Sequence, residues 1–211
     1  MTSPAIVPVT IYGSSISYFT GKLENYFRIK GIPYRLQAMT SRHRELVQQH
    51  TGSTQMPALQ LADGRWMSDT TPIIQWFEAA WPTPAVIPDN PLQRFFSLLL
   101  EDYADEWLWR PAMHYRWYYE AGARFASCHL VNEVAADVPA PAFFKRWLIT
   151  RRQRQGYTVG DGIRPDQVPG VEAIYQRTLA QLEAILATRR FLLGDQPSLV
   201  DIGFSGPIFR H

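Results

Sequence analysis

The first eighty residues alternate short apolar runs with stretches of helical periodicity. Residues 9–12 form a β-branched and aromatic run that predicts a strand. Apolar positions at helical spacing across residues 19–30 then predict an amphipathic helix that ends at Gly31, and residues 34–38 predict a second strand. Because such crossovers are right-handed and join parallel strands, we expect these two strands to be parallel neighbours.

Further turn and cap signals complete this first region. Residues 42–50 predict a polar helix, and residues 57–61 and 65–67 predict two strands joined by the turn-forming pair Asp63-Gly64. Asp69 is a suitable N-cap for a helix whose apolar face continues to Trp81. The expected order is β-α-β-α-β-β-α.

Residues 82–91 contain four prolines in ten positions, which indicates a stiff linker. We therefore place one domain at residues 1–81 and a second at residues 92–211. No convincing strand is expected in the second domain, so the fold class is α/β followed by all-α.

Helical spacing in the second domain predicts three helices, at residues 92–119, 143–154 and from Val171 to a close at Gly194. Residues 156–170 are rich in Gly and Pro and predict a loop. Ser198 and Asp201 have the spacing of a capping box, with Asp in the usual Glu position, and predict the start of a last helix.

Composition excludes several classes of protein. The chain has 211 residues, of which 46% are hydrophobic, so it is not a disordered chain. No apolar run is long enough for a membrane span, and the N-terminal residues lack the features of a signal peptide, so we expect a cytoplasmic protein. The single Cys128 excludes a disulfide framework and a Cys-rich metal site, and a net charge of +2 does not point to nucleic acid.

The aromatic content is high, with seven Trp, ten Tyr and eleven Phe, and much of it lies in residues 95–119. These side chains predict either an apolar substrate pocket with polar edges from Trp109, His114 and Tyr115, or a core between helices. Pro111 is expected to kink or break the helix.

Four local motifs occur in a fixed order: residues 17–22 before residues 30–34, Met56-Pro57, Asp69-Thr70, and Ser198–Asp201. Together with the order of elements they resemble the cytosolic glutathione transferase superfamily. The resemblance implies a thioredoxin-like, glutathione-binding N-terminal domain and an all-helical substrate domain. It also implies glutathione as co-substrate, no metal and a homodimer.

The resemblance further implies that a hydroxyl before the first helix stabilises the glutathione thiolate. A free thiol has a pKa near 8.5, so lowering it by two units requires about 2.7 kcal/mol. The sequence offers Ser17, with Ser15, Tyr18 and Tyr12 as alternatives and Ser14 close by. Ser17 is preferred because it stands where omega-like classes carry their cysteine. The lack of a cysteine in this loop argues against thiol-transfer chemistry.

The remaining glutathione contacts are likewise implied by the resemblance. Met56 would pair with the glutathione backbone beside a cis bond to Pro57. Asp69 and Thr70 would hold the γ-glutamyl group, although Thr70 replaces the usual serine. Gln55 would reach the glycyl end, for which Arg42 and Lys22 are weaker candidates.

The resemblance and these residues predict a glutathione S-transferase that activates the glutathione thiol for attack on an apolar electrophile. A glutathione-dependent peroxidase or isomerase would use the same site, and a catalytically inactive glutathione-transferase-like binding or structural protein is the alternative. The sequence stops at His211, a turn or two into the last predicted helix. Because relatives normally continue, we expect that a C-terminal wall of the substrate site is either missing or lies beyond the given sequence.

Overall fold

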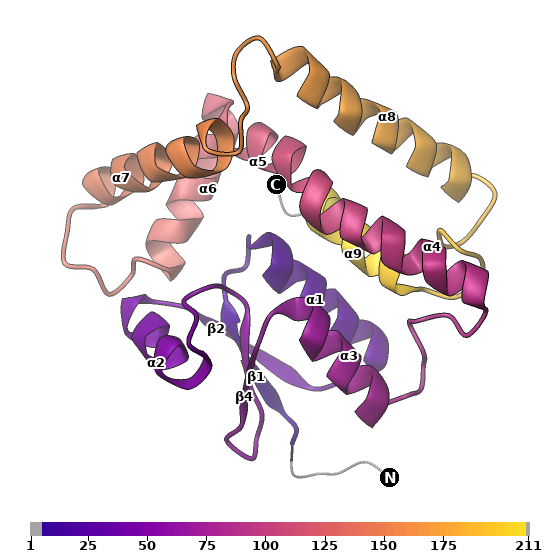
Figure 1. The fold of residues 1–211 in the computed structure, drawn as a ribbon. Coiled ribbons are helices and arrows are strands. Elements are labelled where there is room, and N and C mark those ends of the chain that lie inside the picture. The colour runs from indigo at the N-terminus through magenta and orange to yellow at the C-terminus, as the bar shows by residue number, and fades with distance from the viewer. Residues whose placement is uncertain (1–5, 210–211) are drawn as a thin grey trace. The chain divides into compact units, whose positions relative to one another are not determined.

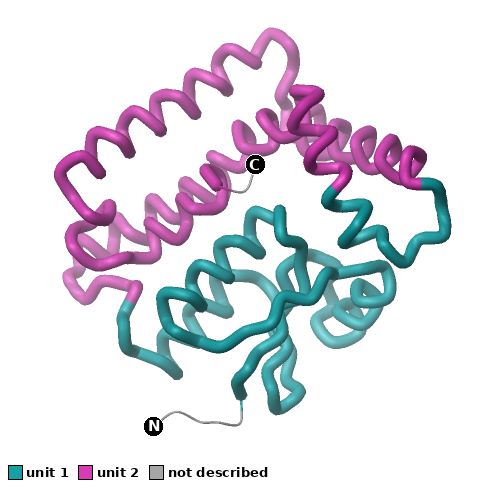
Figure 2. Tube along the Cα trace, turned by 180° about the vertical axis from the view of Figure 1, so that it is seen from behind, with its two compact units in different colours: residues 1–85, 129–141 teal, residues 86–128, 142–211 magenta. Residues whose placement is uncertain are grey.

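The computed structural model describes residues 6–209, so the sequence end at Arg210 and His211 lies outside the described residues. The chain divides into two compact units (Figure 2). The first contains the residues up to Ala85 together with His129–Pro141, and the second contains Val86–Cys128 and the residues from Ala142 onward. The domain limits at residues 81 and 92 stay predictions.

The first unit is built on a four-stranded sheet in the order β2-β1-β3-β4 (Figure 1). Its strands are β1 (Val9–Gly13), β2 (Tyr34–Ala38), β3 (Ala58–Gln60) and β4 (Trp66–Ser68). β1 and β2 are parallel, which confirms the predicted β-α-β unit, and β3 is antiparallel to both β1 and β4.

Three helices complete this unit: α1 (Tyr18–Lys30), α2 (Ser41–Thr51) and α3 (Thr70–Ala80). α1 packs against α3, where the rings of Phe27 and Phe77 meet edge to face at 5.0 Å between centroids. Both rings are fully buried, so they form part of the core. Gly31 ends α1 with φ +65°, a conformation that favours glycine, as the sequence predicts.

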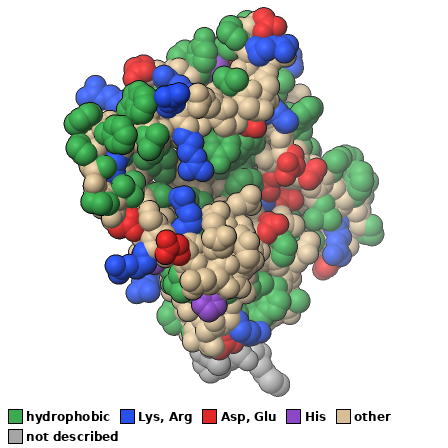
Figure 3. Space-filling model, turned by 60° about the vertical axis from the view of Figure 1, so that its left-hand side comes forward, with side chains coloured by type: hydrophobic (Ala, Val, Ile, Leu, Met, Phe, Trp, Pro, Cys, Tyr) green, Lys and Arg blue, Asp and Glu red, His purple; other side chains and the backbone are tan. Residues whose placement is uncertain are grey.

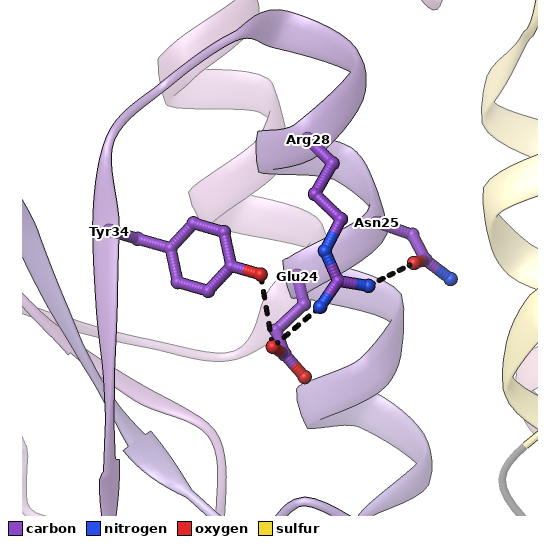
Figure 4. A network of polar contacts seen from close by, with 4 residues as sticks. All are labelled: Glu24, Asn25, Arg28 and Tyr34. Carbon is purple, nitrogen blue, oxygen red and sulfur yellow. Dashed lines mark hydrogen bonds and ion pairs between the residues drawn. The ribbon is translucent and has the colours of Figure 1, made fainter.

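A polar network ties α1 to β2 (Figure 4). The buried Glu24 accepts hydrogen bonds at the same oxygen from Arg28 Nη2 at 3.1 Å and from the Tyr34 hydroxyl at 3.0 Å. Arg28 also donates to Asn25 at 3.2 Å. Burial and then Glu24 raise the pKa of Tyr34, so this hydroxyl stays a donor at neutral pH.

The second unit contains no strand among its described residues, as predicted. Its helical elements are α4 (Pro91–Asp102), η1 (Tyr103–Trp107), α5 (Trp109–Trp117), α6 (Glu120–Glu133), α7 (Ala142–Arg154), η2 (Gln155–Val159), α8 (Val168–Leu186) and α9 (Leu199–Phe209). The last turn of α6 clusters with the first unit.

The prediction that residues 92–119 form a single helix is wrong, because the helix is interrupted. The π-helical turn η1 and Leu108 separate α4 from α5, and Pro111 lies in the first turn of α5, where the missing N–H costs little. The predicted break therefore falls three residues before the proline. α6 was not predicted from the sequence. Its buried positions include Ala123, Ala126 and Ser127, whose small side chains give little hydrophobic periodicity.

Two further boundaries differ from prediction. Residues 155–159 form the π-helical turn η2 rather than a loop, and α8 begins at Val168. α8 ends at Leu186, well before Gly194, which instead lies in a turn that carries an isolated bridge to Phe191. The predicted helix end at Gly194 is therefore wrong, because seven residues lie between Leu186 and this glycine.

The predicted capping box before α9 is present. Asp201 accepts from both the backbone N–H and the hydroxyl of Ser198, each at 2.8 Å, and its other oxygen accepts from Leu192 N–H at 2.8 Å. One carboxylate thus fixes the start of α9 and the turn that precedes it.

Asp201→Ala should lower the free energy of unfolding by about 1–2 kcal/mol, the usual cost of losing a good helix cap. Asp201→Asn should lose less, because its amide oxygen still accepts one of these bonds. Chemical denaturation followed by circular dichroism measures both changes. Equal losses in the two variants would contradict a stabilising role for the acceptor oxygen that asparagine retains.

Within residues 6–209, no helix is both long and apolar enough to cross a bilayer. In the same residues, His, Cys, Asp and Glu side chains form no group of three that could hold a metal ion.

Candidate active site

The strand register brings the predicted glutathione-binding segments to one edge of the sheet. Tyr12 in β1 pairs with Ala58 in β3, and Ala58 pairs with Ser68 in β4. Ser14–Ser17 follow β1, Gln55–Pro57 precede β3, and Asp69 and Thr70 follow β4. These three segments therefore leave the sheet at the same end.

The N-termini of two helices also meet this edge. Ser17 caps α1, and Asp69 caps α3 by accepting from Thr71 N–H at 3.3 Å. Helix N-termini carry partial positive charge and unpaired N–H groups, so this edge favours anionic groups.

The connection from β1 to α1 is tightly packed. A Cβ atom on Gly13 would lie 2.8 Å from Thr20 Cγ2, so only glycine fits without a shift. Thr20 is fully buried and its hydroxyl oxygen has no hydrogen-bond partner in the described residues. The Ser17 N–H donates to the Ser14 carbonyl at 3.0 Å, which closes the turn before the helix.

Two of the four loop hydroxyls in this turn are bound to one carboxylate. Ser14 Oγ donates to Glu133 Oε2 at 2.6 Å, and Ser15 N–H donates to the same oxygen at 2.9 Å. Ser15 Oγ donates to Glu133 Oε1. Glu133 is the last residue of α6, and its participation was not predicted from the sequence.

The other predicted hydroxyls differ in their surroundings. Tyr12 donates to Gln60 Oε1 at 3.1 Å. Tyr18 is almost fully buried, with its ring 4.8 Å from that of Phe19. Ser17 Oγ accepts weakly from Thr20 N–H at 3.4 Å, and the described contacts give its hydroxyl hydrogen no acceptor.

The predicted binding residues on the other two segments are placed as follows. The Met56–Pro57 bond is cis, as the resemblance implies. Met56 is partly buried against the small cluster around Tyr12, and Gln55 is exposed. Asp69 is exposed, with φ +71°, whereas the neighbouring Thr70 is 3% exposed.

Of the three predicted pocket residues of the helical unit, His114 and Tyr115 contact each other, and Trp109 has a different partner. Trp109 donates from Nε1 to Asp161 at 3.0 Å. His114 is fully buried and contacts Glu172 through Nε2 at 2.9 Å, and the Tyr115 ring lies 5.5 Å from the His114 ring. His114 and Tyr115 are thus brought together, in an arrangement that also serves as helix packing.

The Glu172 carboxylate is the centre of this aromatic group. It accepts from the Tyr119 hydroxyl at 2.5 Å and bonds His114. The bond from Tyr119 and then that from His114 lower the pKa of Glu172, while Glu172 raises the pKa of Tyr119 to about 12. Ionised Glu172 and neutral Tyr119 are therefore the stable pair at neutral pH.

α7 exposes large apolar side chains together with arginines. None of its residues is buried, and Phe143, Phe144, Trp147 and Leu148 are all exposed. Figure 3 shows a face on which hydrophobic side chains gather beside Lys and Arg. An open depression between α6 and α7 carries the same combination, with four arginines and Trp147 in its lining.

Two family models match the chain. Residues 16–80 match the glutathione S-transferase N-terminal domain, and residues 165–210 match the glutathione S-transferase C-terminal domain. Together the matches cover more than half of the chain. The chain belongs to the glutathione S-transferase superfamily.

Individual relatives agree with this assignment. Glutathione S-transferase U4 of Arabidopsis thaliana is 25% identical over 100 residues, which cover 46% of this chain and only 44% of that protein. The beta-etherase LigF of Sphingobium sp. strain SYK-6 superposes with a TM-score of 0.62 at 20% identity, covering 98% of this chain and 82% of that one. A glutathione S-transferase of Methylobacillus flagellatus KT, solved with GSH bound, gives 0.59 at 16% identity, covering 96% and 82%. The structural likenesses show the shared fold.

A second acidic residue outside the matched regions contacts the same sheet edge. Asp137 accepts from Ser41 N–H at 3.2 Å and from Arg42 N–H at 3.1 Å, at the start of α2. α2 follows β2, whose last residue Ala38 pairs with Gly13, so Asp137 lies on the edge that carries the serine loop.

The contact of Asp137 predicts a pH dependence. Bonds from Arg42 N–H and then from Ser41 N–H lower the pKa of Asp137 from 3.8 to about 2. A lowered pKa in the folded state stabilises the fold above pH 3.8, and this contribution is lost as the pH falls towards 2. Asp137→Asn should therefore flatten the decline in thermal stability over this range.

The matched control is Asp166→Asn, whose carboxylate is 72% exposed and contacts only Arg164 in the described ion pairs. It should leave the pH profile of thermal stability unchanged. If both variants gave the parent profile, the Asp137 contact would not contribute to stability.

Proposed function

We propose that this chain is a glutathione S-transferase that ionises the glutathione thiol for attack on an apolar electrophile. Membership of the superfamily and the glutathione-bound relative support glutathione as the co-substrate. The observation that carries the proposal is the state of the loop hydroxyls. Ser14 and Ser15 donate to Glu133, whereas the Ser17 hydroxyl at the N-cap of α1 is available to donate.

Ser17 is the proposed catalytic residue. A hydroxyl that donates to sulfur stabilises the thiolate through a charge-assisted hydrogen bond, and the α1 N-terminus adds a favourable dipole. Tyr12 donates to Gln60, and Tyr18 is buried, so both are less suited to this role.

The proposed binding residues lie at the sheet edge around Ser17. Met56, beside Pro57, would pair with the cysteinyl backbone of glutathione. Asp69 would pair with the γ-glutamyl ammonium, and Thr70 with the α3 N-terminus would bind its carboxylate. Gln55 is proposed for the glycyl end.

We keep Trp109 and Tyr115 as proposed contacts for the electrophile, since both are partly exposed within the helical unit. His114 would act through Tyr115, because its own ring is fully buried and lies against the Tyr115 ring. A cytoplasmic homodimer is also proposed. α4 supports a dimer because it exposes an apolar row consisting of Leu92, Phe95, Phe96, Leu98 and Leu99.

Titration calorimetry with glutathione tests the proposal directly. Binding at millimolar concentration or tighter, followed by conjugation of chlorodinitrobenzene, is the expected result. Binding without conjugation but with reduction of an organic hydroperoxide would instead indicate the peroxidase alternative. A folded protein that binds no glutathione at millimolar concentration would be an inactive binding or structural member of the superfamily.

A further inference from the structure

A segment from the helical half of the sequence completes the sheet unit. Residues His129–Pro141, here named the strap, cluster with the first unit. The strap lies outside both family-model matches, which end at residue 80 and resume at residue 165. It reaches the serine loop through Glu133 and α2 through Asp137.

In the contacts with the serine loop, the serines donate every hydrogen bond and Glu133 accepts. A serine hydroxyl has a single hydrogen to donate, and a carboxylate only accepts. Ser14 and Ser15 both use that hydrogen on Glu133, and the Ser15 N–H is used there as well. None of these three donors can serve a sulfur atom while Glu133 holds them.

The strap has a second attachment that keeps Glu133 in place. Asp137, four residues further on, binds two backbone N–H groups at the start of α2. Both attachments lie at the sheet edge where β1 and β2 end. Because the two carboxylates bind different loops of the same edge, the strap is held there at two points.

We propose that Glu133 is a positioning residue that withdraws Ser14 and Ser15 from the thiol and so makes Ser17 the hydroxyl that activates it. This inference rests on the proposed function, since it concerns the hydroxyl that serves the glutathione sulfur. Glu133 itself neither contacts glutathione nor takes part in the reaction. It determines which donor of a serine-rich loop remains available.

The first experiment needs no glutathione. Hydrogen exchange of peptides covering Ser14–Ser17 should quicken about tenfold in Glu133→Ala, as expected from losing a charge-assisted hydrogen bond to the Ser15 N–H. Glu133→Gln should restore part of the protection, because its amide oxygen still accepts. The control is Glu120→Ala, on the same helix, whose 84% exposed carboxylate pairs with Arg154 and should leave these peptides unchanged.

The second experiment is a double-mutant cycle between Glu133 and Ser17, read as kcat/KM with chlorodinitrobenzene and as the thiolate absorbance of bound glutathione against pH. With Glu133 present, Ser17→Ala should cost about 100-fold. In the Glu133→Ala background the same change should cost less than about tenfold, because Ser14 and Ser15 can then donate to sulfur. Ser15→Ala should behave in the opposite way, with an effect only when Glu133 is absent.

The outcomes separate the two proposals. Additive effects in the cycle, or unchanged exchange of the loop in Glu133→Ala, would overturn the role of Glu133. A different result is faster hydrogen exchange in Glu133→Ala together with a parent protein that binds no glutathione. That result would overturn the proposed function and the role of Glu133 in selecting Ser17, but it would leave the contact between the strap and the serine loop intact. If Glu133→Ala does not fold, Glu133→Gln and Glu133→Asp replace it in the double-mutant cycle with Ser17.

Discussion

Glu78→Ala is expected to lower the free energy of unfolding by about 3–5 kcal/mol, because it leaves a buried ammonium group without its counter-ion. Lys30 Nζ lies 2.7 Å from Glu78 Oε1, and the Lys30 side chain is fully buried. The Tyr26 hydroxyl donates to the same oxygen at 2.9 Å. Burial and Glu78 raise the pKa of Tyr26, so it remains a neutral donor that needs this acceptor.

Denaturant unfolding measures the loss, and two variants show its cause. Glu78→Gln keeps an acceptor for Tyr26 but removes the charge, so its loss should be smaller than that of alanine. Glu45→Ala, an exposed position on α2, should change stability by less than about 0.5 kcal/mol. A loss below about 1 kcal/mol in Glu78→Ala would mean that Lys30 finds sufficient compensation elsewhere, for example at the Pro84 carbonyl that it contacts at 2.6 Å.

The sheet unit was predictable because its signals are local. Gly31 ends α1, and the Asp63-Gly64 pair forms the turn between β3 and β4. Each signal acts through the backbone of a few neighbouring residues, so tertiary packing does not override it. The order of these signals then determines the parallel pairing of β1 and β2.

The helical half was less predictable because its boundaries depend on packing. Tyr103 and Trp107 continue the helical spacing of α4, although the backbone forms the π-helical turn between them. α6 buries Ala123 and Ala126 instead of large apolar side chains, so its buried face leaves no clear hydrophobic period. Such features arise from the shape of neighbouring helices and have no signature within a short window.

The candidate site likewise contains some residues that the sequence predicts and others that only the fold reveals. The segment that carries Ser17 was located from its position before α1, and Asp69 from its place as an N-cap. Glu133 and Asp137 were missed, since Glu133 is 119 residues from Ser14 and neither belongs to a recognisable motif. A carboxylate near the end of a helix is ordinarily interpreted as a solvated side chain, and only the fold brings these two to the sheet edge.

Ser17→Ala should lower kcat/KM for conjugation by about 100-fold at neutral pH, the usual effect of removing one hydrogen-bond donor to a developing anion. The Ser17 hydroxyl favours the thiolate, so its loss should raise the pKa of the bound thiol by about two units. The activity of the variant should therefore recover as the pH rises towards the pKa of free glutathione. A purely structural defect would not produce this pH dependence.

Ser17→Thr provides the matched control, because it keeps the hydroxyl at the N-cap and should retain most of the activity. Loss of the weak 3.4 Å cap bond in Ser17→Ala should cost at most about 1 kcal/mol of stability, so the fold remains intact for the assay. Full activity in Ser17→Ala would transfer the role to another loop hydroxyl. Because Ser15 donates to Glu133, that result would also require the strap to release Ser15 when glutathione binds.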